Sequence, residues 1–394
     1  MTASAKAARI EHLTVAGGQN LQCVWPGQGG LWQWGDELLA AFIESPCAYR
    51  YPHEAARDLN GIWKRGYVRL RRSMDGGATW ADDGKPFDNS LSFEKQRQLL
   101  RLTEFRGHAS PEREAPDHNS SDTVLLMGRA WCGDEIPGTR MRHSVVYCIR
   151  AAERGRLWEA MPGLVLAHHT NSLIPVANNT LRCADGSMIA WLSATDGSEC
   201  TGQPVEYHGP ALYRSDDGGA SWHFFAEIAC DPARRIAYAS PRLVPLPSGR
   251  WLCFMNAWFA AAAVPRCWTA LCWSDDQGLN WSAPRRLAMW SWSPYPLRLS
   301  DGRLVLLSAR CAPDPAGLFC LVSGDDGDTW SRPILLREGA LLAGSRGVVN
   351  FGYPVAVERG PGQILVLYDW QNRDEDVPWY GGRSFIAGTQ FELV

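Results

Sequence analysis

The chain has 394 residues, of which 45% are hydrophobic and 21% charged, and its formal net charge is −3. This composition is that of a folded globular protein, and the lack of a basic excess argues against a nucleic-acid partner. No apolar run reaches the roughly 18 residues needed to cross a bilayer, and the N-terminal segment lacks the apolar stretch of a signal peptide. We therefore expect a cytoplasmic monomer or homo-oligomer with no membrane partner.

The 12 cysteines are scattered singly and form no CxxC pair. This spacing gives no support to a zinc ribbon or a thioredoxin-type motif. Small buried thiols are favoured over a disulfide framework, and no metal or other cofactor is expected.

From the N-terminus onward, two patterns alternate along the chain. The first is a β-hairpin, an apolar strand followed by a tight turn and a second apolar strand. Hairpins of this kind begin near residues 31, 122, 174, 240, 293 and 353. The second is the turn motif S-x-D-x-G-x-x-W, which occupies residues 73–80, 215–222, 274–281 and 323–330. A degenerate copy, AAERGRLW at residues 151–158, keeps the Gly and the Trp in register.

The turn motif is structural rather than catalytic. Its Ser and Asp can hydrogen-bond to the turn backbone, its Gly supplies a positive φ, and its Trp packs between sheets. We expect Glu153 to take the place of the motif Asp in the degenerate copy, and the five Trp rings to be substantially buried. Repeated four-stranded units without amphipathic helices predict an all-β, six-bladed β-propeller that forms a single domain over residues 1–394. The terminal strands RIEHLTVAG and SFIAGTQFELV are expected to close it.

These repeats, with the DGRL-type hairpins and the strand LLAAFIE that leads to VRLRRSMDGGATW, resemble the sialidase (neuraminidase) superfamily and its BNR, or Asp-box, repeats. The resemblance covers nearly the whole chain. It implies an exo-acting glycoside hydrolase in which Tyr353, in FGYPVAV, is the nucleophile of a retaining mechanism and Asp58 is the acid/base. Tyr353 could instead only fill the propeller channel, and Asp58 could be a solvated carboxylate paired with Arg57 or Lys64.

The chain departs from this family at the groups that hold the substrate carboxylate and assist the tyrosine. The first of three family arginines is missing from NLQCVWP, Trp258 stands in the place of the second, and Arg310 matches the third only loosely. Ser240 stands where the family has its glutamate, so Glu206, or else His169, is the candidate partner for the tyrosine. The substrate is therefore expected to be an acidic or unusual sugar that need not be sialic acid.

Further polar and aromatic residues are expected at the same end of the propeller. Carboxylates, imidazoles and aromatic rings gather in the predicted strand starts and loops there, a composition typical of a carbohydrate pocket. Glu44 and Asp369 are among these carboxylates. The candidates for substrate binding are Arg50, His169, Asn171, Asp196, Arg242, Trp292 and Arg310. The adjacent His168 and His169 would point to opposite faces of a strand, so no metal site is expected there.

Two other functions fit the same residues. A uronate polysaccharide or oligosaccharide lyase would use a histidine and a tyrosine as base and acid at a C5 proton. A non-catalytic propeller would bind a glycan or a protein. Many carboxylates around a channel favour an enzyme, whereas a flat face of exposed aromatic rings would favour a binding protein.

Overall fold

The computed structural model describes residues 5–48, 62, 65–86, 120–135, 142–159, 163–165, 172–195, 208–260, 267–310, 316–339, 352–371 and 384–394. Nearly every element in these ranges is a β-strand, and no helix among them has the length and apolar character needed to span a membrane. By its internal contacts the chain divides into two compact units, Met1–Lys85 with Met289–Val394, and Pro86–Ala288.

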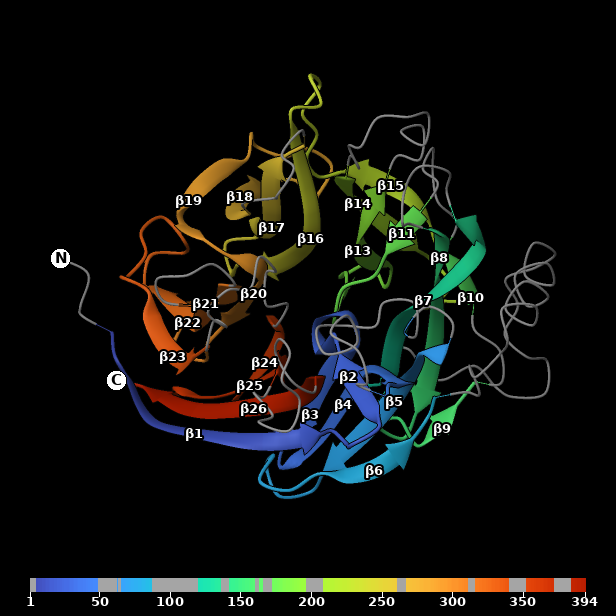
Figure 1. Ribbon diagram of the computed structural model, residues 1–394. Helices are drawn as coiled ribbons and strands as arrows, with labels where there is room; N and C mark the ends of the chain where they lie inside the picture. The colour runs from blue at the N-terminus through green and yellow to red at the C-terminus, as the bar shows by residue number, and fades with distance from the viewer. Residues whose placement is uncertain are drawn as a thin grey trace. The chain divides into compact units, whose positions relative to one another are not determined.

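The first unit contains the first, fifth and sixth blades (Figure 1). The first blade is formed by β2 (Leu21–Val24), β3 (Gly30–Trp34), β4 (Glu37–Pro46), β5 (Tyr67–Ser73) and β6 (Ala81–Gly84), with the 3-10 turn η1 (Pro26–Gln28) between β2 and β3. The fifth is formed by β20 (Trp292–Arg298), β21 (Leu304–Arg310), β22 (Gly317–Ser323) and β23 (Ile334–Glu338). The sixth is formed by β24 (Gly352–Gly360), β25 (Gln363–Gln371), β26 (Ser384–Leu393) and β1 (Ala7–Ala16).

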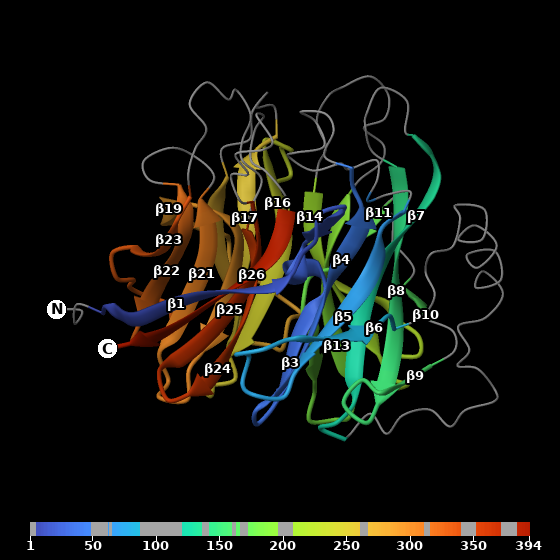
Figure 2. The same ribbon diagram turned by 60° about the horizontal axis from the view of Figure 1, so that its bottom comes forward.

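The N-terminal strand completes the last blade, as the sequence predicted. β1 pairs antiparallel with β26, with Ala7 opposite Leu393 and Ala16 opposite Ile386. Figure 2 shows β1 running along the outer edge of β26. The backbone groups of β26 that would otherwise face solvent are thereby paired.

The second unit contains the other three blades. The second blade is described by β7 (Val124–Glu135), β8 (Arg142–Ala152), β9 (Leu157–Trp158) and β10 (Gly163–Val165). The third is formed by β11 (Ser172–Ile174), β12 (Thr180–Arg182), β13 (Met188–Thr195), β14 (His208–Ser215) and β15 (His223–Glu227). The fourth is formed by β16 (Ile236–Pro245), β17 (Trp251–Phe259), β18 (Trp268–Ser274) and β19 (Arg285–Trp290). Six such blades make the chain a six-bladed β-propeller, which confirms the predicted fold class.

The hydrophobic core lies between neighbouring blades. In the first unit, Leu307 of β21 and Tyr368 of β25 belong to one buried cluster. In the second unit, Leu212 of β14 shares a cluster with Trp251 of β17. Nine cysteines lie in the described residues, seven of them buried, and none of the nine forms a disulfide.

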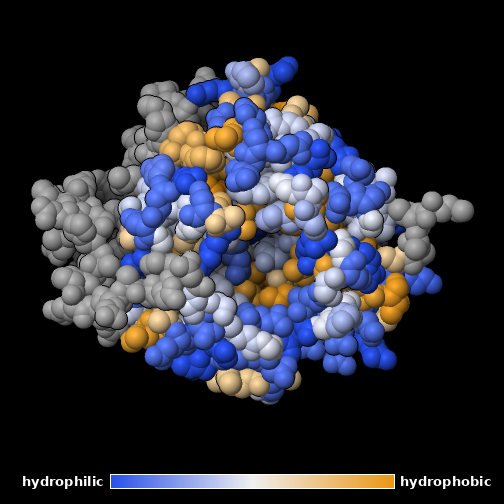
Figure 3. Space-filling model, turned by 180° about the vertical axis from the view of Figure 1, so that it is seen from behind, coloured by the Kyte–Doolittle hydropathy of each residue, from blue (hydrophilic) through white to orange (hydrophobic). Residues whose placement is uncertain are grey.

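The face of the molecule drawn in Figure 3 is mostly hydrophilic. Figure 3 shows one face of the molecule, on which apolar residues form small separate patches among polar ones. Large hydrophobic side chains exposed in the described residues are few, which is usual for a protein surface. They are Ile10, Met74, Leu157, Phe259, Leu279, Leu335 and Val394.

The four intact Asp boxes share one set of hydrogen bonds. In the first blade, Ser73 Oγ donates to Asp75 Oδ1 at 2.8 Å and accepts the Gly77 N–H at 2.8 Å. Asp75 Oδ1 also accepts the Thr79 N–H at 2.9 Å, and Trp80 Nε1 donates to Gly77 O at 3.0 Å. The same bonds recur with nearly identical lengths in the other three boxes. The motif residues therefore stabilise a turn, as predicted.

The motif tryptophans are less buried than predicted. Trp222 is only 4% exposed. The other four, Trp80, Trp158, Trp281 and Trp330, are half-buried. Trp80, Trp281 and Trp330 each precede the last strand of their blade, and Trp158 ends the short strand β9.

The degenerate box keeps the turn without its side-chain bonds. Arg154 and Gly155 have φ of 58° and 82°, close to the 74° and 91° of Gly76 and Gly77, which hold the same two positions in the first blade. Glu153, just before them, has a φ of 52°. Glu153 thus lies in the predicted turn. Ala151 stands in the place of the motif Ser and has no hydroxyl to donate. The turn is closed instead by the hydrogen bond from the Gly155 N–H to the Ala152 carbonyl.

Candidate functional site

The first strands of three blades carry the same backbone irregularity. Ser240, Ser293 and Tyr353 each precede a proline and have φ of 54°, 54° and 50°. The pairing register shifts by one residue at each of them, which marks a β-bulge. A left-handed residue before proline is strained, and a bulge re-aims its side chain. The three blades share the bulge but not the residue at it. The fourth and fifth blades have a serine there, and the sixth blade has a tyrosine.

Two indole rings flank Tyr353. The ring centroid of Trp25 lies 6.2 Å from that of Tyr353 at an interplanar angle of 60°, and that of Trp292 lies 6.2 Å away at 80°. Such tilted and edge-on pairs are favourable for aromatic rings. Val24 and Ile62 complete an apolar cluster against which Tyr353 packs. Tyr353 and Trp292 are only half-buried, so both retain exposed surface.

Two glycines let the backbone approach closely around Tyr353. A Cβ on Gly27 would lie 2.6 Å from the Tyr353 carbonyl oxygen. Gly352 has φ of 128°, and a Cβ there would lie 2.5 Å from Cβ of Ala309. A larger residue at Gly27 would collide with Tyr353 itself, and one at Gly352, next to the tyrosine in the chain, would collide with Ala309, so both glycines hold the backbone around Tyr353.

Asp369 is a buried carboxylate on the strand that pairs with the strand of Tyr353. It lies on β25 directly opposite Gly352 and is 0% exposed. Strand alternation places Asp369 on the same face as Leu365, which approaches Gly77 of the first blade. Tyr353 packs against residues of the first blade as well, so both strands have neighbours in that blade.

A second carboxylate and phenol meet in the first blade. Tyr67 Oη donates a short hydrogen bond to Glu44 Oε1, and Glu44 is only 4% exposed. Burial, and then the hydrogen bond with Glu44, raises the pKa of Tyr67 to about 12. The Lys85 ammonium lies 3.8 Å from the centre of the Tyr67 ring. Tyr67 therefore keeps its proton at neutral pH, and the pair acts as a rigid support where β4 ends and β5 begins.

The structure brings together two of the predicted site residues, Tyr353 and Trp292. Arg242 lies in the second unit on β16, 3% exposed, where Nη1 donates to the Pro241 carbonyl at 3.4 Å. This burial leaves little of the guanidinium accessible to a ligand. Arg310 ends β21, and its side chain is outside the description. The other predicted site residues lie outside the described residues: Arg50, Asp58, His169, Asn171, Asp196 and Glu206.

Trp25 and Tyr67 were not predicted as site residues from the sequence. Trp25 precedes Pro26 and has φ of 58°, so it repeats the residue-proline pattern of the bulges. That pattern was the signal that could have revealed it. The contact of Tyr67 with Glu44 joins residues 23 positions apart in the chain, and no local sequence pattern indicates it. Among the described residues, no three His, Cys, Asp or Glu side chains are grouped so as to hold a metal ion.

The family model described as a BNR repeat-like domain matches residues 117–366, well over half of the chain. The chain belongs to this family. The search of curated proteins finds no match.

Solved structures with the same fold cover nearly the whole chain. A protein of unknown function from Dyadobacter fermentans is 17% identical with a TM-score of 0.71, and the match covers 99% of this chain and 100% of that one. The α-L-arabinanase of Penicillium chrysogenum, solved with arabinobiose, is 15% identical with a TM-score of 0.59 over 97% and 98% of the two chains. The Hadza microbial sialidase Hz136 is 16% identical with a TM-score of 0.57 over 95% and 65%. At these identities the likeness shows the fold alone.

Proposed function

We propose that this BNR-repeat protein is a glycoside hydrolase whose catalytic centre is built around Tyr353. The observation that carries the proposal is the presentation of Tyr353 on a strained bulge between two indole rings, with a buried carboxylate on the paired strand. Similarity to an arabinanase and a sialidase supports the reaction class, because both of those proteins act on glycosidic bonds in the same fold.

In the proposed reaction, Tyr353 Oη attacks the anomeric carbon and the bond from that carbon to the leaving oxygen breaks. Asp58 donates a proton to the leaving oxygen and then takes one from the water that releases the sugar. An ordinary phenol has a pKa of about 10, so the tyrosine needs a base for its proton. Glu206 is the carboxylate favoured by the sequence, and Asp369 is the described carboxylate whose strand position fits the same task.

Among the described residues, the side chains that pack against Tyr353 are aromatic and apolar, and such rings can stack on a sugar. The half-buried Trp292 ring retains surface on which a sugar face can pack, and the buried Trp25 holds the tyrosine from the other side. Two of the three arginines that would clamp a sialic acid carboxylate are missing from the sequence. We propose an acidic or unusual sugar other than sialic acid as the substrate.

The test is a screen of purified protein against aryl-glycosides, including an α-L-arabinofuranoside and a sialoside, and against polyuronates. Hydrolysis of a non-sialic glycoside with new reducing ends is the expected result, with negligible release from the sialoside. Ultraviolet absorbance from an unsaturated uronate would identify the lyase alternative instead. Binding of an oligosaccharide without any turnover would identify a non-catalytic propeller, and robust turnover of the sialoside would contradict the argument from the missing arginines.

A further inference from the structure

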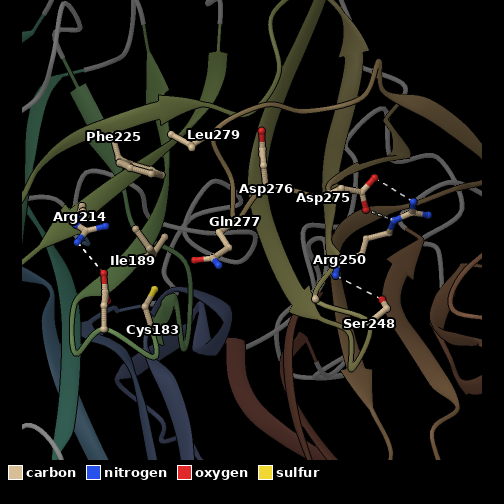
Figure 4. Close-up of a pocket in the computed structure, with 12 residues that line it drawn as sticks. Cys183, Ile189, Arg214, Phe225, Ser248, Arg250, Asp275, Asp276, Gln277 and Leu279 are labelled. Carbon is tan, nitrogen blue, oxygen red and sulfur yellow. Dashed lines mark hydrogen bonds and ion pairs between the residues drawn. The ribbon is translucent and has the colours of Figure 1, made fainter.

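A pocket of about 640 Å³ lies in the second unit, where the hairpin turns of the third and fourth blades meet the Asp box of the fourth (Figure 4). Asp185 and Arg214 line it from the third blade, and Arg250, Gln277 and Leu279 from the fourth. β16 carries its bulge between Ala239 and Arg242, and the pocket is lined by Ser248, Gly249 and Arg250, which follow the end of β16 at Pro245. The pocket therefore lies beyond the C-terminal end of β16 and shares no residue with the bulge.

The charges of the pocket wall are held in pairs. Arg214 contacts Asp185 at 3.0 Å and Asp216 at 2.8 Å, and Arg250 contacts Asp275 through two hydrogen bonds of 2.7 and 3.0 Å. Figure 4 shows the Arg250 pair on one side of the pocket and Arg214 on the other. An ionic ligand would have to compete with these internal partners, so the wall suits a neutral ligand that offers several hydroxyl groups.

The pocket also offers an apolar surface. Phe225 and Leu279 lie together on one side of it in Figure 4, with Ile189 below them. Leu279 is 58% exposed, one of the few large hydrophobic side chains in the described residues that are exposed to this degree. The pocket has the size of a small-ligand site, and its mainly polar lining with a small apolar surface suits a ligand that offers both hydroxyl groups and a C–H face.

The fourth-blade Asp box differs from the others at the residues that line the pocket. Gln277 has φ of 59°, at a position held by Gly76 and Gly218 in two boxes and by Asp326 in another. A long side chain in the left-handed region is strained where glycine would not be. Leu279 likewise replaces the Ala or Asp of the other three boxes. The fold does not need either residue, since the other boxes close the same turn without them.

We propose that this pocket binds a neutral stretch of carbohydrate chain, at a site separate from Tyr353. The Gln277 amide and the Arg250–Asp275 pair would bond to sugar hydroxyls, and Phe225 with Leu279 would pack against the C–H face of a ring. The choice of ligand class rests on the proposed function, and the location of the site rests on the pocket alone.

The experiment uses the full chain with Tyr353→Phe to prevent turnover, and three neutral probes: α-1,5-arabinotriose, cellotriose and N-acetyllactosamine. Binding is measured by calorimetry and located by hydrogen exchange. We expect one probe to bind with protection of residues 183–189 and 275–281. Gln277→Gly and Leu279→Ala should each weaken that binding by at least about fivefold. Asp326→Gly, the same change at the equivalent position of the fifth blade, should leave it unaltered.

The inference is overturned if none of the probes binds, or if binding protects only residues 352–360 and is unchanged in the Gln277 and Leu279 variants. In the second case the proposed catalytic site would stand and only the second site would fall. Conversely, binding at the pocket by a wild-type protein that hydrolyses no glycoside would keep the site and refute the hydrolase. Because Gln277→Gly restores the residue of two other boxes, loss of folding is not expected in that variant.

Discussion

In the proposed reaction, the proton on the Tyr353 phenol must reach a base before the tyrosine can attack a sugar. We propose Asp369 as the described carboxylate that accepts it, because Asp369 is buried and pairs with Gly352, the residue before Tyr353. We expect Asp369→Asn to lower kcat by roughly 10²-fold, the usual lower limit for losing a general base, and to change KM little. Steady-state kinetics across pH measure this.

A structural role for Asp369 would give a different pattern. Loss of a buried carboxylate that only supports packing would lower Tm and leave the acidic limb of the kcat profile in place. If Asp369→Asn keeps both kcat and the pH profile of the wild type, Glu206 becomes the remaining carboxylate candidate for the proton of Tyr353.

The Asp box of the first blade makes the free energy of unfolding depend on pH. The Thr79 hydroxyl and N–H, followed by the Ser73 hydroxyl, lower the pKa of Asp75 from 3.8 to about 2. Because the folded pKa lies below the unfolded one, the unfolded chain binds more protons between these values. The contribution of Asp75 to stability is thus complete above pH about 4 and is lost as the pH falls towards about 2.

Asp75→Asn should therefore be less stable than the wild type at neutral pH, with a difference that shrinks as the pH falls below about 4. Urea unfolding of both proteins at pH 7 and at pH 3 measures the two differences. An equal destabilisation at both pH values would mean that the carboxylate charge contributes nothing to the turn.

The boxes were predictable because their hydrogen bonds join residues within eight positions of the chain. Glu153 in the degenerate copy was placed for the same reason, since the Gly and Trp spacing fixes the turn. Burial of the motif tryptophans was predicted less well, because it depends on how fully the edge of each blade is covered. The contact between Trp25 and Tyr353 joins residues more than 300 positions apart, and only the folded chain reveals it.

For the molecule as a whole, the N-terminal strand ties the first residues of the chain to the last. β1 covers the edge of β26 along most of its length, and Val15 and Ala16 at its end are buried. Deletion of residues 1–16 should lower Tm by several degrees, on the order of 5 °C, and promote association through the uncovered edge. Thermal unfolding and size-exclusion chromatography at several concentrations measure both effects.

Arg9→Ala is the matched control for the deletion. It removes only the 3.3 Å ion pair with Glu392, in which the arginine side chain is 80% exposed, so Tm should change little. A truncated protein that stays monomeric with the Tm of the wild type would show that the sixth blade is stable with three strands.

The repeats predicted the fold class, and the family resemblance predicted that Tyr353 lies at the start of the first strand of the last blade. Neither predicted the substrate. Substrate choice depends on loops that differ between members of one fold, and six of the predicted site residues lie outside the described residues. The described part of the proposed site contributes aromatic rings and a buried carboxylate, and these residue types do not specify a particular sugar.

The central claim is that Tyr353 is the reacting group of a glycoside hydrolase. The most direct measurement is kcat for Tyr353→Phe on the best glycoside of the screen, beside Tyr368→Phe, which removes a phenol from the core of the same blade. We expect Tyr353→Phe to lose at least about 100-fold in kcat at unchanged Tm, and Tyr368→Phe to lose stability rather than kcat. Near-complete activity of Tyr353→Phe would contradict the account and leave the tyrosine as a residue that fills the propeller channel.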